Sequence, residues 1–392
     1  MDIDTARALV SPLGEQALRA AAELLAPESL AAGEAMRRDY PPALAAAALT
    51  QIQLRRAAEA KLGERAGQLL WTRDGLEQAT RGAVARWRAR RMAGARVRTV
   101  LDLGCGIGSD ALAFLDAGLG VVAVEADPAT AVLAAHNLPG AQVICADATA
   151  VADELIARAG PHACVFLDPA RRTARGRSWR VEDLSPPWSF VLAMAARRAG
   201  LCVKLGPGIA PEILPAALDA LWVSEHGELV ECGLWALPAT DHRAGQRGAV
   251  LLPQGLQVTR RDGADELPVG PLGHWLYEPD PAVSRAGALS SIGAGLRRLH
   301  PQVAYLAADE PIDTGLATGF EVIDVLDPAT KVLRRWVGEH EVGRLEIKKR
   351  AVQVDPAQLR RALRPRGPHA ATLILTPTSE GTRALVVRRM PH

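Results

Sequence analysis

Residues 99–110 read Thr-Val-Leu-Asp-Leu-Gly-Cys-Gly-Ile-Gly-Ser-Asp, and this stretch decides the fold. The apolar run Thr99–Leu103 is typical of a buried parallel strand. Ser109 stands where a helix N-cap is expected, before the apolar-rich segment Ala111–Ala117. A strand, a glycine turn and a helix start form a floor on which a ligand lies against bare backbone. Three glycines at alternate positions make the turn: Gly104, Gly106 and Gly108.

The spacing of these glycines and the acid before them indicate the kind of ligand. The last position of a G-x-G-x-x-G dinucleotide fingerprint is Ser109 here, so the spacing is G-x-G-x-G. The carboxylate of Asp102 suits a cationic amine better than a pyrophosphate. The pattern Asp-x-Gly-x-Gly-x-Gly resembles motif I of the class I S-adenosylmethionine (SAM) dependent methyltransferases. That resemblance implies SAM as cofactor, S-adenosylhomocysteine as product, and cofactor contacts from Asp102 and the three glycines.

Strand-like runs recur after the glycine loop, and acids follow three of them. Val121–Val124 leads to Glu125, and an acid about 20 residues after the glycine loop is placed to hold a ribose diol. Gln142–Ala146 leads to Asp147, where the resembling family contacts the adenine amino group. The remaining runs are Ala163–Leu167, which leads to Asp168, and Leu201–Leu205. From these strand ends we predict further cofactor contacts at Glu125, Ala126, Asp147, Ala148 and Asp168.

The repeat of strand, acid and helix predicts an α/β fold with a doubly wound, Rossmann-like sheet. The same fold with a different ligand remains the alternative, because such folds host many functions.

The fourth run ends in a segment that resembles an acceptor motif. Asp168-Pro169 stands where N-methylating relatives carry Asn/Asp-Pro-Pro and an aromatic residue, which together hold and stack on a flipped base. Here Ala170 replaces the second proline and Arg171 the aromatic residue, which leaves the acceptor atom open. Catalytic roles are predicted for Asp168, Pro169 and Arg171. Arg171 or Arg172 is expected to stack on a base or grip an RNA phosphate.

Two other features bear on the reaction. Ser185-Pro186-Pro187-Trp188 imitates the S-P-P-W motif of cap-hypermethylating enzymes, but it follows a charged loop, so we interpret it as a helix start. No cysteine stands in a loop suited to a covalent C5-methylating nucleophile, so direct in-line transfer is expected.

Composition excludes several classes of protein. The 392 residues are 48% hydrophobic and 23% charged, which is typical of a soluble protein of two to four domains. Apolar stretches are shorter than the ~20 residues of a membrane span, and the acidic start Met1–Asp4 is no signal peptide, so we expect a cytoplasmic protein. The five cysteines form no C-x-x-C pair and the nine histidines do not cluster, so no metal site is expected.

Charge is distributed unevenly along the chain. Residues 331–392 hold fourteen Lys or Arg and five acids, a local charge of +9, whereas the remainder carries −7. A basic module of this kind is typical of a polyanion binder. A GC-rich genome that inflates arginine content is the alternative interpretation. We predict RNA contacts at Lys348, Lys349 and Arg350, together with Arg172.

The segment before the first strand is predicted to be helical. Residues 1–70 form a helical region, in which Leu44–Leu62 is the most regular helix and acts as a lid or only packs. In the resembling methyltransferases the next element closes over the methionine end of the cofactor, which makes Thr72 and Gln78 candidate contacts. The arginines of the helix that runs to Arg91 are expected on a solvated surface, with RNA contact as the alternative.

Three further domains are predicted after this region. Residues 71–257 form the methyltransferase domain, 258–330 a small α+β (ferredoxin-like) region and 331–392 a basic domain. Within them we expect helices over Ala210–Leu221 and Val283–Leu299, and a hairpin of Glu228–Leu237 with Gly248–Leu252. The chain ends with two further motifs, Tyr277-Glu278-Pro279-Asp280-Pro281 and Glu346-Ile347-Lys348-Lys349-Arg350. With these motifs, the order of its parts is similar to that of a bacterial family of class I methyltransferases with a C-terminal THUMP-like domain.

THUMP modules deliver structured RNA, usually tRNA, to a catalytic domain. The resemblance therefore implies a SAM-dependent methyltransferase that methylates a base in structured RNA, tRNA or rRNA, with no membrane and no obligate protein partner. Two alternatives remain: a small-molecule or protein methyltransferase whose basic tail is structural, and a non-catalytic protein that binds SAM or RNA.

Overall fold

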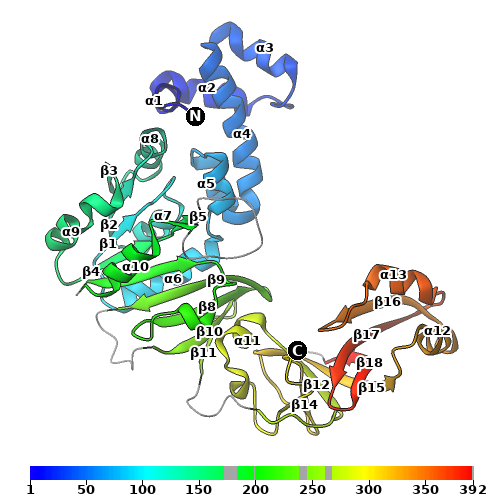
Figure 1. Ribbon diagram of the computed structural model, residues 1–392. Coiled ribbons are helices and arrows are strands. Elements are labelled where there is room, and N and C mark those ends of the chain that lie inside the picture. The colour runs from blue at the N-terminus through cyan, green and yellow to red at the C-terminus, as the bar shows by residue number, and fades with distance from the viewer. Residues whose placement is uncertain (172–182, 198, 238–244, 261–266, 391–392) are drawn as a thin grey trace. The chain divides into compact units, whose positions relative to one another are not determined.

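The computed structural model describes residues 1–171, 183–197, 199–237, 245–260 and 267–390 (Figure 1). The chain divides into two compact units. The first comprises Met1–Ala220 and Glu231–Gly245, and the second comprises Leu221–Val230 and Gln246–His392.

The first unit begins with helices built largely from alanine and leucine, whose side chains let helix axes approach closely. Asp2, Ser11 and Ser29 cap the first three helices by accepting hydrogen bonds from backbone N–H groups three residues ahead. Their core also includes Leu133 of α8, so these helices pack on the sheet domain. The elements are α1 (Ile3–Leu9), α2 (Pro12–Ala22), α3 (Leu30–Asp39), α4 (Pro42–Leu62), a 3-10 turn (Gly63–Gln68), α5 (Arg73–Gln78) and α6 (Gly82–Gly94).

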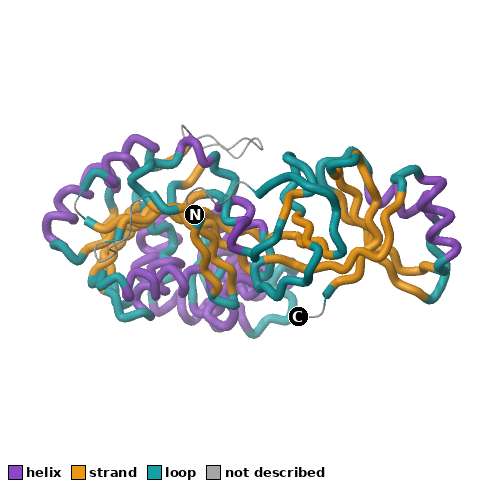
Figure 2. The backbone as a smooth tube through the Cα atoms, turned by 90° about the horizontal axis from the view of Figure 1, so that it is seen from below, coloured by secondary structure: helices purple, strands orange, loops and turns teal. Residues whose placement is uncertain are grey.

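A nine-stranded sheet follows, in the order β11-β10-β8-β9-β7-β4-β1-β2-β3. The strands β7, β4, β1, β2 and β3 are parallel, and their layer lies between helices on both sides (Figure 2). Because such strands are buried on both faces, they read as continuous apolar runs. The strands are β1 (Thr99–Leu103), β2 (Gly120–Glu125), β3 (Gln142–Cys145), β4 (Ala163–Leu167), β7 (Gly200–Leu205), β8 (Asp219–Glu225), β9 (Glu228–Ala236), β10 (Arg247–Leu252) and β11 (Leu256–Thr259).

The helices between these strands are amphipathic or wholly apolar, as crossover helices on a parallel sheet must be. A small antiparallel pair, β5 with β6, stands apart from the sheet. The elements are α7 (Ser109–Asp116), α8 (Pro128–Asn137), α9 (Ala148–Ala159), β5 (Ala170–Arg171), β6 (Leu184–Ser185), α10 (Trp188–Ala195) and a 3-10 turn (Pro211–Ile213).

The second unit contains a seven-stranded sheet in the order β13-β14-β12-β15-β18-β17-β16. Alternation along β17 gives the sheet a core on each face: Leu373 and Leu375 pack with the helices α12 and α13, whereas Ile374 packs with Phe320. The elements are β12 (Trp275–Pro279), α11 (Pro281–Ala286), a 3-10 turn (Leu289–Ser291), β13 (Arg297–Arg298), β14 (Leu306–Ala308), β15 (Ala317–Leu326), α12 (Thr330–Glu339), β16 (Val342–Lys349), α13 (Pro356–Leu363), β17 (His369–Thr378) and β18 (Gly381–Arg389).

The position of the predicted boundary at residue 330 is informative. It falls at the first residue of α12, and the seven-stranded sheet continues across it because β18 pairs with β15. Residues 267–330 and 331–390 therefore share one sheet.

Three elements differ from their prediction. Ala210–Leu221 is not a helix but a 3-10 turn followed by the start of β8, because Pro211 and Pro215 interrupt an otherwise helical composition. The predicted hairpin of β9 with β10 is also wrong, because β8, whose first residues were expected to be helical, lies between these strands. The helix predicted over Val283–Leu299 ends at Ala286, where Gly287 adopts a left-handed φ of 69°.

Candidate active site

A cavity of about 800 Å³ opens at the carboxyl ends of β1 to β4. Ligands of open α/β sheets bind at this edge. All the predicted cofactor contacts except Gly108 line the cavity, although they come from five separate segments. Those that line it are Thr72, Gln78, Asp102, Gly104, Gly106, Glu125, Ala126, Asp147, Ala148 and Asp168.

The glycine loop forms the floor of this cavity with backbone alone. Gly104 and Gly106 have φ angles of 105° and 55°, and a Cβ atom at either residue would meet no atom within 4 Å. Gly108 has a different reason to be glycine, because a Cβ atom there would lie 2.6 Å from Cδ1 of Leu138. Gly108 is also the N-cap of α7, so the N-cap prediction for Ser109 is wrong: Ser109 is the first helical residue.

Hydrogen bonds fix the loop and the neighbouring strand ends. Glu125 accepts from the backbone N–H of Gly106 at 2.9 Å and from that of Asp127 at 2.8 Å. Asn137, which sequence reasoning missed, donates from Nδ2 to the carbonyl of Ile107 at 2.9 Å. Asp147 caps α9 through the N–H of Thr149. The cavity wall is therefore fixed before any ligand binds.

Asp102 is the one acid at this edge that the described residues leave without a partner. Its side chain is buried, and neither carboxylate oxygen accepts a hydrogen bond from the described part of the chain. Burial, and then the nearby carboxylates of Asp110, Asp168 and Glu125, raise the pKa of Asp102 well above its usual range. A buried carboxylate without a partner is costly. A cationic group in the cavity would remove that cost, which fits the ammonium group of SAM.

Asp168 is held by a lysine that sequence reasoning did not single out. Leu167 pairs with Val203 across β4 and β7, so the next residues, Asp168 and Lys204, stand side by side at the carboxyl ends of the strands. The ammonium of Lys204 lies 2.5 Å from Oδ2 of Asp168. The sequence feature that could have indicated a role for Lys204 is that it is the single charged residue in the apolar run Leu201–Leu205.

A buried ion network lies behind the cavity. Arg88 is fully buried in α6, pairs with Asp110 and donates to both carboxylate oxygens of Glu231 at 2.7 Å. Thr80 donates to the second oxygen of Asp110 at 2.7 Å. Burial opposes ionisation of Asp110, but the charges of Arg88 and Lys204 and the hydrogen bonds from Thr80 and Arg88 together outweigh it and lower the pKa of that carboxyl. The prediction of a solvated or RNA-facing helix is therefore wrong for Arg88.

The acceptor side of the cavity is built from two short segments. Phe166, Asp168 and Ala170 line one part, and Ser185-Pro186-Pro187 lines another. The latter segment does precede a helix, since α10 begins at Trp188, but it also reaches the cavity. The segment is therefore the predicted helix start, and the pairing of β5 with β6 also brings it back to the end of β4.

The remaining predicted residues of this region differ in their placement. Pro169 follows Asp168 but does not line the cavity. Arg171 ends β5, while its side chain and all of Arg172 lie outside the described residues.

Comparison with known proteins assigns the family. Over 339 residues the chain is 34% identical to an uncharacterized S-adenosylmethionine-dependent methyltransferase of Mycobacterium tuberculosis strain CDC 1551, covering 84% of this chain and 92% of the relative. Its counterpart in strain H37Rv matches to the same extent. The chain belongs to the S-adenosylmethionine-dependent methyltransferases.

The fold of this methyltransferase is also seen in a crystal structure. A provisionally assigned methyltransferase from Porphyromonas gingivalis W83 superposes with a TM-score of 0.80 at 22% identity, covering 96% of this chain and 99% of the other. The predicted α/β fold with a Rossmann-like sheet and a C-terminal α+β module is confirmed.

Two family models match parts of the methyltransferase. A THUMP domain-like model matches residues 317–389, which confirms the predicted THUMP-like domain, although the match begins with β15. A domain of unknown function matches residues 2–58, the helices α1 to α4. No helix among the described residues of the methyltransferase is both long and apolar enough to span a bilayer.

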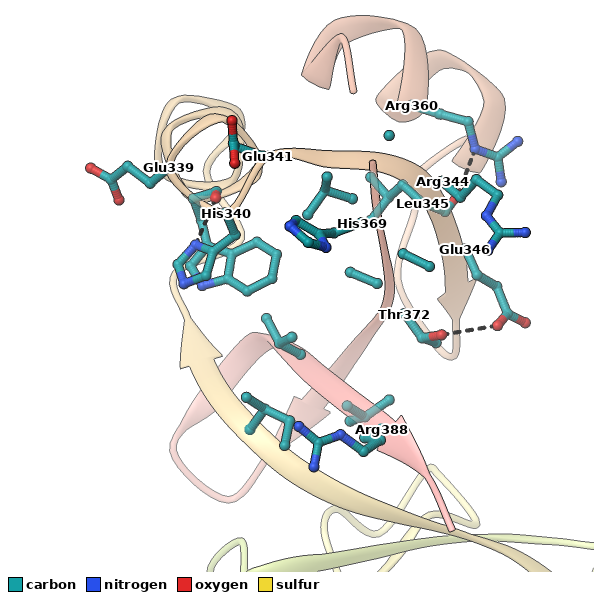
Figure 3. A pocket seen from close by; sticks show the side chains of 18 of the residues that line it. Glu339, His340, Glu341, Arg344, Leu345, Glu346, Arg360, His369, Thr372 and Arg388 are labelled. Carbon is teal, nitrogen blue, oxygen red and sulfur yellow. Dashed lines mark hydrogen bonds between the residues drawn. The ribbon is translucent and has the colours of Figure 1, made fainter. Parts of the chain in front are cut away.

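The THUMP-like domain of the methyltransferase holds a groove of about 1060 Å³ (Figure 3). His340 lies on one side of it and Arg344 with Arg360 on another, while Arg388 lies on the strand below. His340 stacks on Trp336 with ring centroids 4.1 Å apart. Three acids, Glu339, Glu341 and Glu346, also line the groove, so its charge is mixed.

The three residues of the predicted basic run at the end of β16 differ in their exposure. Lys348 is half-buried and pairs with Glu278 of β12. Lys349 and Arg350 are exposed, and their side chains have no ion-pair partner among the described residues. The predicted RNA contacts are thus not equivalent: Lys348 is engaged within the domain, while Lys349 and Arg350 face solvent.

Proposed function

We propose that this methyltransferase methylates a base in structured RNA, tRNA or rRNA, by direct in-line transfer from SAM. One observation carries the RNA assignment: of the fourteen basic side chains in residues 331–392, all but Lys348 and Arg383 are exposed, within a domain that matches a THUMP-like model. Exposed cations in excess of nearby acids are the usual source of affinity for phosphates.

The groove adds a second kind of contact to this surface. Exposed Arg344 and Arg388 offer charge, and the Trp336–His340 stack offers a flat ring face beside the exposed Ile323. Unpaired bases stack on aromatic faces while arginines bind the backbone. This mixed lining favours a single-stranded or looped part of an RNA over a uniform double helix.

The cavity of the first unit supports the catalytic half of the proposal. SAM supplies a methyl group already activated on a sulfonium, so the protein mainly has to align the reacting groups. Asp102 would hold the cofactor's ammonium, the backbone of Gly104 and Gly106 would bear its methionine part, and Glu125 would bind its ribose. Asp147 would hold the adenine, with Thr72 and Gln78 closing over the methionine end.

The acceptor would enter between Asp168 and the proline segment. Oδ2 of Asp168 is engaged by Lys204, and Oδ1 accepts no hydrogen bond from the described residues, so it is free to accept one from an acceptor N–H. Pro186 and Pro187 would pack against the face of a flipped base. We infer further that the reaction needs no metal and takes place in the cytoplasm.

A labelling experiment tests this proposal. The purified protein is incubated with methyl-tritiated SAM and total RNA, total protein or a metabolite extract from cells that lack it, with and without EDTA. Label in RNA that persists in EDTA is expected. Label in protein or metabolites instead would overturn the RNA assignment, and SAM binding without transfer to any fraction would overturn catalysis.

A further inference from the structure

Acidic side chains outnumber the cations around the cofactor cavity, and Lys204 neutralises one of them. Seven acidic residues line the cavity: Asp74, Asp102, Asp110, Glu125, Asp127, Asp147 and Asp168. Arg88 neutralises Asp110 but is shared with Glu231. Lys204 is the cation that pairs with Asp168.

The ammonium group of Lys204 joins two parts of the site. It donates to Oδ2 of Asp168 at 2.5 Å and to the backbone carbonyl of Gln78 at 3.3 Å. Gln78 is the last residue of α5, and both residues line the cavity. Only 15% of the Lys204 side chain is exposed, so water screens these contacts weakly.

A second lysine grips the same end of α5 without touching Asp168. Lys61 donates to the carbonyls of Leu76 at 2.6 Å and Glu77 at 2.9 Å. The last three carbonyls of α5 are thus held by two lysines, and Lys204 alone extends the link to the acceptor side. Cations are favourable at this end of a helix because the carbonyls there lack partners within it.

We propose that Lys204 is a positioning residue for methyl transfer, which fixes and neutralises the Asp168 carboxylate and ties it to the end of α5. The inference rests on the role of Asp168 in the proposed function. One oxygen of Asp168 is held by the ammonium and the other is left for the acceptor. The Asp168 carboxylate, fixed in this way, is already oriented when the methyl acceptor binds.

The surroundings of Lys204 keep it charged. Burial by itself would lower the pKa of Lys204, but the carboxylates that face it outweigh burial and raise the pKa. The lysine therefore holds its proton in the folded protein. The charged groups that face it are Asp168 from the end of β4, Asp110 from α7, Glu231 from β9, Arg88 from α6 and Lys61 from α4.

Ligand charge provides a test that needs no acceptor. SAM carries a sulfonium and S-adenosylhomocysteine a neutral sulfur, so the ratio of their affinities reports the charge of the cavity. Calorimetry at pH 8, where an unpaired carboxylate is ionised, is done on Lys204→Met, with Lys61→Met as the matched control. Loss of the ammonium leaves Asp168 unneutralised, so Lys204→Met should raise the SAM to S-adenosylhomocysteine affinity ratio by about fivefold to tenfold.

Three comparisons make the test decisive. Lys61→Met, which loosens the same helix, should leave the ratio unchanged, and Lys204→Met/Asp168→Asn should return it to the wild-type value. Lys204→Arg, which keeps the charge, should also keep the ratio. An unchanged ratio in Lys204→Met, or an equal change in Lys61→Met, would overturn the proposal. Lys204→Gln carries the same test if Lys204→Met does not fold.

Turnover separates this inference from the proposed function. On total RNA from cells that lack the protein, Lys204→Met should lower kcat by about tenfold or more and change the KM for SAM less. If the wild-type protein labels no RNA, the proposed function fails while the affinity ratios still decide the role of Lys204. If kcat of Lys204→Met equals that of the wild type, the positioning role fails and the RNA assignment stands.

Discussion

The cofactor cavity and the THUMP-like surface use charge in opposite ways. The charged groups that line the cavity are mostly acidic, and two of them, Asp110 and Asp168, are paired with the buried or half-buried cations Arg88 and Lys204. On the THUMP-like domain they are exposed, largely unpaired and mostly basic. A buried array selects one small cation by geometry and is insensitive to salt, whereas an exposed array attracts polyanions and is screened. The two regions therefore match a compact cofactor and an extended nucleic acid.

The largest effect is expected where the cavity depends on backbone alone. Gly106→Val places a branched side chain at a φ of 55° and points it into the cavity, so SAM affinity should fall by about 1,000-fold. Gly118→Val is the matched control, because Gly118 has a similar φ of 78° and a Cβ there also meets no atom, but it lies outside the cavity. Calorimetry should show unchanged SAM affinity for the control. Equal losses in both variants would break the idea of a preformed backbone floor.

The carboxylate of Asp168 should affect turnover more than cofactor binding. Asp168→Ala should reduce kcat by about 100-fold, because a group that accepts the acceptor proton contributes on this scale. SAM affinity should fall less, by up to about tenfold, because the variant leaves the ammonium of Lys204 without its partner. Asp153→Ala, on the outer face of α9 and paired only with Arg197, serves as the control. Full activity of Asp168→Ala in the tritium assay would mean that the acceptor is oriented elsewhere.

Asp102 should show opposite effects on binding and stability. Asp102→Asn removes the charge that meets the cofactor's ammonium, so SAM affinity should fall by about tenfold. The folded protein raises the pKa of Asp102, so its stabilising contribution is present below the usual pKa and is lost as pH rises through the raised value. The ligand-free variant should therefore melt a few degrees higher than the wild type at neutral pH, and the gap should grow with pH. A variant that melts lower at pH 8 would show that Asp102 has an unseen partner.

The smallest effect is expected for substitutions on the exposed basic surface, because many cations there contribute to RNA affinity. Lys349→Glu/Arg350→Glu should weaken RNA binding by about threefold to tenfold and make the slope of log affinity against log salt shallower by about one for each phosphate that the variant no longer binds. Arg37→Glu/Arg38→Glu on α3 is the matched control, since this pair is also adjacent and exposed. An unchanged slope in the first variant would remove these residues from the RNA surface, and equal changes in both would make the attraction non-specific.

Sequence alone could predict those parts of the site that follow strand ends. Asp102, Glu125 and Asp168 each stand directly at the end of an apolar run, so their convergence follows from a parallel sheet. Arg88 and Lys204 could not be placed in this way. Arg88 is buried by partners 22 and 143 residues away, and Lys204 meets Asp168 only through the register of β4 with β7.

The errors in the fold have an equally physical origin. β8 was missed because Asp219-Ala220-Leu221 has helix-forming composition, while its place between β9 and β10 gives the backbone a sheet environment that overrides propensity. Pro211 and Gly287 mark the points at which the two predicted helices are interrupted or end. Greater weight on these residues than on helix-forming composition would have corrected both elements.

The place of β18 in the seven-stranded sheet determines when that sheet can be completed during synthesis on the ribosome. Residues 381–389 lie between β15 and β17, so a middle strand is missing until translation has passed residue 389. Until then β15 presents an unpaired edge and the apolar groups that pack on Phe320 remain uncovered. The Rossmann-like sheet can gather its parallel strands much earlier in translation. We therefore expect a nascent chain whose second sheet is incomplete and exposes an apolar edge, and chaperones would act on this species.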